Sequence, residues 1–373
     1  MTNFTYWPYD EVTLSLGASD IEVIVDAPWL STGLKFDPAH RERIISLVEK
    51  FKLQSLEASD LQEVNWFFSS LSTYPLCYIL PGTSPAGVDA HAVQDSTLGT
   101  LDQKSFLNTA LEETGHEPEA ATVLKHSLFQ GDWKWDAQGA IDFSRTPSGI
   151  DPRALFSVAR RYHLLSSLEN DLTGDLYLQV RATKDNDELF KRASALMVRQ
   201  NHYVTQRCNS SLEPALARAM SSRPMVEHFM LEEKGHDRIL NAALKSIVDD
   251  PGAVPVVSES VVLMDMLKFA AERNFLSFAI VVDAFERSSY QESDPLAEVL
   301  QEGGLTKAAS QINNHKDIND SGEHENLALG FILNMAPVDE AYAVEALRIA
   351  ETTSNLMNLL STGVRTQLTS LIP

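Results

Sequence analysis

The sequence predicts a mainly α-helical protein with a smaller α+β region at its N-terminus. The first part of the chain mixes period-two alternation with helical spacing, whereas from about Pro152 onward apolar residues recur every three or four positions. Short breaks separate roughly seven or eight predicted helices, which is typical of an all-α bundle. These breaks fall at Pro224, Pro251, Pro255, Pro295 and Pro337. Because the chain has 373 residues, we expect two domains, residues 1–150 and 151–373.

The N-terminal region contains a strand, two helices and a strand, in that order. Residues 11–29 alternate apolar and polar side chains, which predicts one or two strands interrupted at Gly17. Asp37 and Pro38 form a helix cap and first turn, and apolar residues at helical spacing follow them. A second helical run over residues 61–71 leads into an apolar, strand-like segment. Together these elements predict a small α+β unit.

The order of these elements resembles a winged-helix module of the peptide-recognition kind that begins enzymes modifying ribosomal peptides. The resemblance covers about the first 85 residues and rests on element order, with no motif. It implies that this region binds a peptide. Residues 82–151 are rich in Gly, Pro, Asp and Ser, which predicts a connector of loops and short elements before the helical part.

Composition narrows the range of partners. Lys and Arg number 30 against 52 Asp and Glu, and the net charge of −22 repels phosphate, so nucleic acid and acidic membrane surfaces are poor candidates. No uncharged apolar window approaches the length of a membrane span. Cys77 and Cys208 have no metal-site or disulfide spacing and are predicted to be reduced, packed thiols. With no secretory signal at the N-terminus, we expect a cytoplasmic protein.

Potential metal ligands occur at three places in the helical region. Glu233 and His236, in LEEKGHDRIL, are three positions apart, which predicts that both project from one helix face. Asp283 and Glu286 interrupt the apolar run FAIVVDAFERSS, where a buried carboxylate needs a partner. The third place is the segment INNHKDINDSGEHENLALGF. Its candidate ligands are His315, Asp317, Asp320 and His324.

Each place alone has an ordinary structural explanation. An E-x-x-H pair is common on solvated helices, and Glu286 is explained equally well as an ion-pair partner of Arg273 or Arg287. The sequence NDSG in the third segment is also typical of a turn. The combination is more specific, because carboxylates and imidazoles on separate helices can converge in a bundle core. Such a mixed oxygen and nitrogen set suits iron or manganese better than zinc or calcium.

Taken together, the three motifs resemble those of the heme-oxygenase-like diiron oxidases. The family has a helix with E-x-x-H, a carboxylate some fifty residues later, and a helix with H-x-x-x-D-x-x-H. Glu233 with His236 matches the first element, and Glu286 matches the second. His315, Asp320 and His324 approximate the third, with the different spacing H-x-x-x-x-D-x-x-x-H.

The altered spacing in the third motif has a geometric consequence. On an ideal helix His315 and His324 point about 180° apart. A π-bulge near Asn319, or an unwound turn around Gly322, would bring them to one site. Without either, His315 drops out and Asp317 becomes the reserve ligand.

The resemblance implies a non-haem diiron, O2-dependent oxidase or oxygenase. It would use two Fe ions, cycling between Fe(II) and Fe(III), with O2 as co-substrate. The substrate would be a small amine, amino-acid-like or peptide-borne molecule, changed by N-oxygenation, C–C cleavage or desaturation. A homodimer is one assembly to test. The implied metal ligands are Glu233, His236, Glu286, His315, Asp320 and His324.

Other readings remain open. A haem-binding or cofactor-free enzyme of the same fold is one alternative, and a non-catalytic peptide-recognition or scaffold protein is another. His202 and His228 lie near the first motif and could reach a metal site from outside the ligand set. For both we favour the simpler interpretation, a hydrogen-bonded histidine of the core or its boundary. No G-x-S-x-G nucleophile elbow is present.

Overall fold

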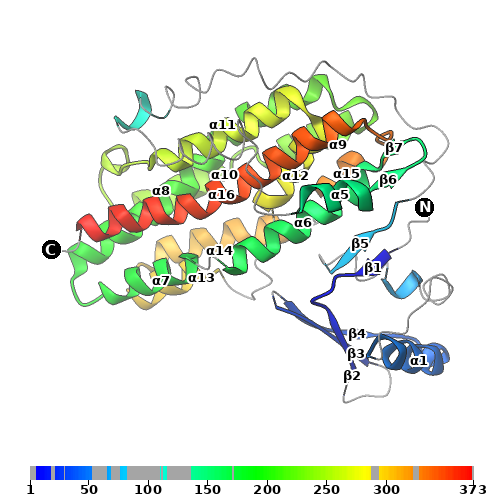
Figure 1. Cartoon of the computed structure of the whole chain (residues 1–373). Coiled ribbons are helices and arrows are strands. Elements are labelled where there is room, and N and C mark those ends of the chain that lie inside the picture. The colour runs from blue at the N-terminus through cyan, green and yellow to red at the C-terminus, as the bar shows by residue number, and fades with distance from the viewer. Residues whose placement is uncertain are drawn as a thin grey trace.

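The protein is mainly helical, with a small sheet region near the N-terminus. In the computed structural model, the helices form an elongated body and the strands lie at one end of it (Figure 1). None of the described helices is long and apolar enough to cross a membrane. The structure describes residues 6–17, 22–28, 30–52, 65–68, 76–81, 110, 112–115, 136–169, 172–286, 294–321 and 327–371.

The strands of the N-terminal region form two small antiparallel sheets in the part of the chain that is described. One sheet joins β1 to β5, and the other has the order β2-β3-β4. Gly17 falls between β2 and β3, so the prediction of strands broken there is confirmed. β4 was not predicted, because LSTGLK lacks a β-branched run. The strands are β1 (Tyr6–Pro8), β2 (Thr13–Leu16), β3 (Glu22–Ala27), β4 (Leu30–Lys35) and β5 (Cys77–Ile79).

The first predicted helix begins where its cap signal lies. Asp37 accepts a 2.8 Å hydrogen bond from the backbone N–H of Ala39 and caps a 3₁₀ turn over Pro38–His40. α1 (Arg41–Lys52) follows directly. Its buried face consists of Ile44, Leu47 and Val48. The second predicted helix is helical at residues 65–68, and the rest of it lies outside the described residues.

The helical body follows the periodicity of the sequence. Its core combines apolar side chains from most of the helices into one large cluster and one smaller cluster. A short hairpin, β6 (Arg145–Thr146) and β7 (Gly149–Ile150), precedes the main helices. The helices are α5 (Ala137–Phe143), α6 (Pro152–Glu169), α7 (Leu172–Ala182), α8 (Asp187–Leu212), α9 (Arg223–Glu232), α10 (His236–Lys245), α11 (Ser258–Arg273), α12 (Phe275–Glu286), α13 (Pro295–Glu302), α14 (Thr306–Ser321), α15 (Leu327–Ile332) and α16 (Glu340–Leu371).

One continuous run of apolar spacing, over residues 258–289, predicts a single helix but folds as two. Asn274 is fully buried and has extended backbone geometry between α11 and α12. Its side-chain oxygen accepts a hydrogen bond from the Ser277 N–H at 2.9 Å, and its amide donates to the Tyr342 carbonyl at 3.1 Å. An asparagine that caps the next helix in this way competes with helix continuation. Periodicity alone does not detect such a break.

The N-terminal strands are attached to α6 by specific hydrogen bonds. The buried Tyr9 hydroxyl donates to the Ser157 carbonyl at 2.9 Å, and the Ile79 N–H donates to the Ser157 hydroxyl at 3.1 Å. At the rim, Arg161 donates to the Glu11 carboxylate at 3.0 Å. The apolar residues of the two regions belong to one core cluster. The predicted boundary at residue 150 stays a prediction.

A buried ion pair joins α6 to α12. The Arg160 guanidinium binds the Asp283 carboxylate, with Nε 3.0 Å from Oδ1 and 3.1 Å from Oδ2. Both side chains are buried. The sequence predicts that a buried carboxylate in FAIVVDAFERSS needs a partner, and for Asp283 that partner is Arg160. Arg273, which the sequence suggests as a partner of Glu286, binds Glu345 at 3.2 Å.

Removing one member of this pair tests its importance. Asp283→Ala leaves a buried guanidinium uncompensated, so we expect the free energy of unfolding to fall by about 3–5 kcal/mol. The exposed pair of Lys268 and Glu272 is the control, and Glu272→Ala should cost about 1 kcal/mol or less. Urea denaturation followed by circular dichroism measures both. Equal, small losses would mean that the buried pair does not hold the two helices together.

Candidate functional site

The predicted ligand motifs lie on helices that pack together. α10 contacts both α8 and α14, so the helix that begins at His236 packs against the helix that carries His315. α12 ends at Glu286, the residue of the second motif. The packing thus brings the helices of the first and third motifs together, and Glu286 lies close enough to Cys208 of α8 to act on it electrostatically.

The first motif does not lie on one continuous helix, which corrects the sequence prediction. Glu233 caps the end of α9, and His236 is the first residue of α10. Gly235 between them has a φ of 108°, a left-handed geometry that favours glycine and turns the chain. The two side chains nevertheless lie close together, as the sequence predicts: Glu233 Oε1 is 3.4 Å from His236 Nδ1.

His236 is the chemically unusual residue of this pair. Its side chain is almost completely buried, and neither ring nitrogen makes a hydrogen bond with any described residue. Leaving a buried polar group without a hydrogen bond costs about 1–3 kcal/mol. Buried groups in native proteins are nearly always satisfied, so an exception calls for an explanation. A ligand bound to one of these ring nitrogens would be such an explanation.

His315, the first residue of the third motif, lies beside this pair. Its ring centroid is 5.0 Å from that of His236, and the two rings meet edge to face at 78°. His315 is half-buried, whereas the reserve ligand Asp317 is exposed. The geometry therefore favours His315 over Asp317 as the residue that α14 directs toward the site.

The remainder of the third motif is only partly described. α14 is α-helical from Thr306 to Ser321, so the first of the two alternatives, a π-bulge near Asn319, does not occur. The alternative, an unwound turn around Gly322, lies outside the described residues. His324 and the side chain of Asp320 lie outside them as well, and their roles stay predictions.

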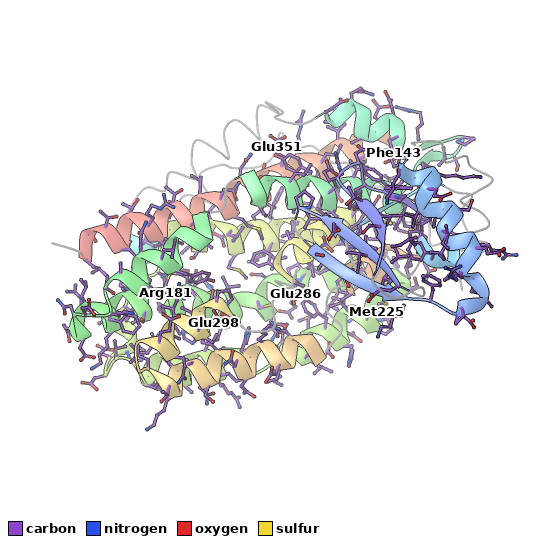
Figure 2. All side chains as sticks on the ribbon, turned by 90° about the horizontal axis from the view of Figure 1, so that it is seen from below. Phe143, Arg181, Met225, Glu286, Glu298 and Glu351 are labelled. Carbon is purple, nitrogen blue, oxygen red and sulfur yellow. The ribbon has the colours of Figure 1, made fainter. Side chains whose placement is uncertain are left out.

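Glu286 reaches the same region through Cys208 of α8. The Cys208 thiol is buried on α8. Burial raises the pKa of this thiol well above its usual value, and the nearby carboxylates of Glu233 and Glu286 raise it further. Figure 2 labels Glu286 near the middle of the long helical body. The sequence prediction of buried, reduced cysteines is confirmed, because Cys77 and Cys208 are both buried and free.

The chemistry of this cluster fits part of a metal centre. Glu233 offers carboxylate oxygens, and His236 and His315 offer imidazole nitrogens, the donors that iron accepts. The two hydrogen-bond-free nitrogens of His236 are the observation that supports the fit. Among the described side chains, no three His, Cys, Asp or Glu residues are grouped closely enough to hold a metal ion. The complete ligand set remains a prediction that includes Asp320 and His324.

The two histidines near the first motif have other partners. His202 Nδ1 lies 2.9 Å from the Arg199 guanidinium, and burial together with this charge lowers the pKa of the imidazole. His228 is 69% exposed and lies 3.3 Å from Glu232. The simpler interpretation, a histidine of the core or its boundary, agrees with the position of His202, whereas it is wrong for His228, which lies at the surface.

Sequence reasoning missed a buried polar stretch in the middle of α16. The hydroxyls of Thr352 and Thr353 donate to the carbonyls of Arg348 and Ile349, one turn earlier. His163, to which the sequence assigns no role, places Nε2 2.9 Å from the Ala350 carbonyl oxygen. The polar run ETTSN, residues 351–355, is the sequence feature from which this buried polar stretch could have been predicted. The buried polar residues of α16 are Glu345, Glu351, Thr352, Thr353, Ser354 and Asn355.

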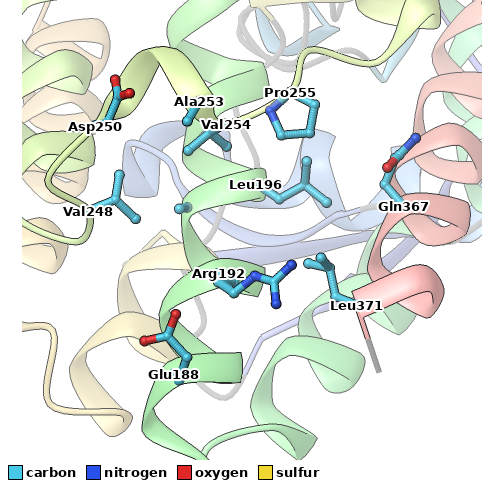
Figure 3. Close-up of a pocket in the computed structure, with 11 residues that line it drawn as sticks. Glu188, Arg192, Leu196, Val248, Asp250, Ala253, Val254, Pro255, Gln367 and Leu371 are labelled. Carbon is cyan, nitrogen blue, oxygen red and sulfur yellow. The ribbon is translucent and has the colours of Figure 1, made fainter. Parts of the chain in front are cut away.

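A cavity of about 310 Å³ lies elsewhere in the helical body (Figure 3). It is lined by the start of α8, residues 248–255 and the end of α16, and by none of the predicted ligands. Glu188 in its wall is about 30 Å along α8 from Cys208, at 1.5 Å per residue. This cavity is therefore separate from the cluster around His236.

Replacing His236 in the ligand-free protein tests whether its imidazole serves the fold. With a chelator present, we expect His236→Leu to leave the free energy of unfolding unchanged or to raise it by about 1–3 kcal/mol, because a buried polar group without hydrogen bonds is removed. Leu240→Ala, at a fully buried position of the same helix, should cost about 2–5 kcal/mol. If His236→Leu is as costly as Leu240→Ala, the imidazole has a structural role.

Comparison with protein-family models, with curated proteins and with solved structures gives no match. The functional assignment therefore rests on the residues described above. Among them, the buried pair of Glu233 and His236, with His315 beside it and Glu286 nearby, has the most distinctive chemistry.

Proposed function

We propose that this chain is a non-haem diiron, O2-dependent oxidase or oxygenase, with a heme-oxygenase-like helical bundle. Its substrate is a small amine, amino-acid-like or peptide-borne molecule. One observation carries the proposal: His236 is buried between Glu233 and His315, and its two ring nitrogens make no hydrogen bond with the described residues. A buried imidazole of this kind is suited to bind a metal ion.

The residues have distinct roles in this proposal. Glu233 and His236 would hold one iron, and Glu286 would bind the second iron or both. His315 approaches from α14, and the resemblance implies that Asp320 and His324 complete the set. When bound, the two irons supply the electrons that reduce O2 and allow an organic substrate to be oxidised, which no side chain can do.

The surrounding chain supports such a site by burial and by fixed geometry. Glu233 and His236 are 5% and 3% exposed, so little water competes for their donor atoms. The Glu233 N–H donates to the Phe229 carbonyl at 2.9 Å, which fixes the backbone at the end of α9. In α12, the residues Phe278–Val282 are all apolar and buried, and the helix ends four positions later at Glu286. A low local dielectric strengthens the attraction between carboxylates and a cation.

Iron binding is the direct test. After anaerobic loading with Fe(II), we expect about two irons per chain in the wild type, as in carboxylate-bridged helical proteins. Glu233→Gln, His236→Gln and Glu286→Gln should each lower the iron content. Glu232→Gln and His228→Gln are matched controls, because they change a carboxylate and an imidazole that pair at the surface of the same helix. The controls should keep wild-type iron content.

The alternatives predict different results in this experiment. A sharp Soret band would favour the haem-binding enzyme, and the absence of both iron and haem would favour the scaffold protein. Two irons that persist in all three substituted variants would show that the ligands are other residues.

Oxygen reactivity provides a second test. We expect the iron-loaded protein to consume O2 and to show a transient visible absorption, because reduced iron is oxidised at the site. Glu233→Ala and Glu286→Ala should abolish both signals while far-ultraviolet circular dichroism remains nearly unchanged, since each replaces one side chain at a helix end. An oxygen electrode and stopped-flow absorption measure the effect. Unaltered signals in both variants would contradict the proposed ligand roles.

A further inference from the structure

The cavity in Figure 3 has no part in the proposed metal site. It has a volume of about 310 Å³ and lies between α8, the end of α16 and residues 248–255, which belong to the connection between α10 and α11. Pockets that bind small molecules begin at about this size, and most of them combine an apolar lining with a few polar groups. The nature of the lining therefore indicates which ligand would fit.

The inner part of the lining is apolar. Ala195 and Leu196 of α8 are buried and belong to the smaller core cluster of the helical body. Val248, Val254 and Leu371 pack against the same cluster and also line the cavity. Such a surface favours a ligand with an apolar body, because contact between the two removes apolar surface from water.

The wall formed by residues 248–255 is fixed by hydrogen bonds to α8. Arg199 Nε donates to the Val254 carbonyl at 3.3 Å. The side-chain amide of Gln200, which is almost completely buried, donates to the Pro255 carbonyl at 3.1 Å. The cavity is thus formed before any ligand binds, and the cost of ordering this wall does not reduce the affinity.

Arg192 is the one cation among the described residues that line the cavity. It is exposed and, within the described part of the chain, makes no hydrogen bond or ion pair. The adjacent Lys191 binds Asp187, one helical turn away, at 2.7 Å. Arg192 and Glu188 have the same spacing without forming such a pair, and Figure 3 shows the Arg192 guanidinium directed away from Glu188, toward Leu371. The N–H donors of Arg192 are therefore open to a ligand.

We propose that this cavity binds a small carboxylic acid with an apolar body, in the form of its monoanion. The carboxylate accepts two parallel hydrogen bonds from the planar guanidinium of Arg192, and the apolar body covers Leu196 and Val254. A dianion such as a phosphate monoester fits less well, because Glu188 and Asp250 also line the cavity and the net charge of the chain is −22.

The inference goes beyond the proposed function and is independent of it. The predicted metal ligands whose side chains are described do not line this cavity. Binding can therefore be measured on the intact chain without iron, and its result leaves the diiron proposal untouched.

Titration with phenylbutyrate tests the proposal, because this probe joins one carboxylate to an aromatic ring through a short chain. By isothermal titration calorimetry in the presence of a chelator, we expect one saturable site per chain. Phenylbutanol and phenylbutylamine have the same apolar body without the negative charge, and both should bind about 10-fold more weakly or not at all. Absence of saturable phenylbutyrate binding, or equal affinity for all three compounds, overturns the proposal.

Substitutions at the cavity locate the binding site. Arg192→Gln should weaken phenylbutyrate binding about 10-fold, because hydrogen bonds from a charged donor are lost. Lys191→Gln is the matched control, since it removes the same charge from the adjacent position outside the cavity lining, and it should bind as the wild type does. Ala253→Trp, at an exposed position of the lining, fills the cavity and should abolish binding without lowering the thermal stability.

Two outcomes of these substitutions contradict the proposed site. Equal weakening in Arg192→Gln and Lys191→Gln would show that only the overall charge of the chain matters. Unchanged binding in Ala253→Trp would show that phenylbutyrate binds elsewhere on the protein. Either outcome overturns the proposal.

Discussion

The packing of α10 between α8 and α14 is the constraint on which the candidate site depends. It buries the first residue of α10, His236, at a point where the chain has just turned through Gly235. A helix N-terminus buried in this way also places Glu233, three residues earlier, beside it. The carboxylate and the imidazole are therefore adjacent because of the turn between two helices, and the shared helix face that the spacing predicts is not needed.

Three of the buried carboxylates elsewhere in this protein form ion pairs with arginine. Asp151 binds Arg153 at 2.8 Å, Asp283 binds Arg160, and Glu345 binds Arg273. Each of these pairs satisfies the requirement that a buried ionised group have a partner of opposite charge. Two of them link helices that are far apart in the sequence, so they also fix the register of the helical body. They account for Asp283, which the sequence alone cannot separate from a ligand.

The sequence predicted the fold class well because periodicity reports burial. The strands around Gly17, the cap at Asp37 and the helical character after residue 152 all follow from local patterns that the structure repeats. Prediction from the sequence failed at helix boundaries that one side chain or one backbone angle determines. Gly235 and Asn274 each lie between two consecutive helices, where left-handed geometry or a side-chain cap overrides helical periodicity.

Part of the candidate site could also be predicted from the spacing of residues in the sequence. Spacing correctly put Glu233 beside His236, since both a helical turn and a tight glycine turn bring such residues together. The approach of His315 depends on how α14 packs against α10, which spacing within α14 does not encode. The nearness of Cys208 to Glu233 and Glu286 could not be predicted from local sequence either, because it depends on how α8 packs.

The charge on Glu233 supplies the last step of the argument. Among the described residues, its ion-pair contact is to His236, whereas Asp151, Asp283 and Glu345 each meet an arginine. Glu286 adds a second acidic group near Cys208. A carboxylate that is buried as an anion calls for a partner of opposite charge. Under the proposed function, a divalent cation would supply that charge beside Glu233 and would bind one of the two ring nitrogens of His236.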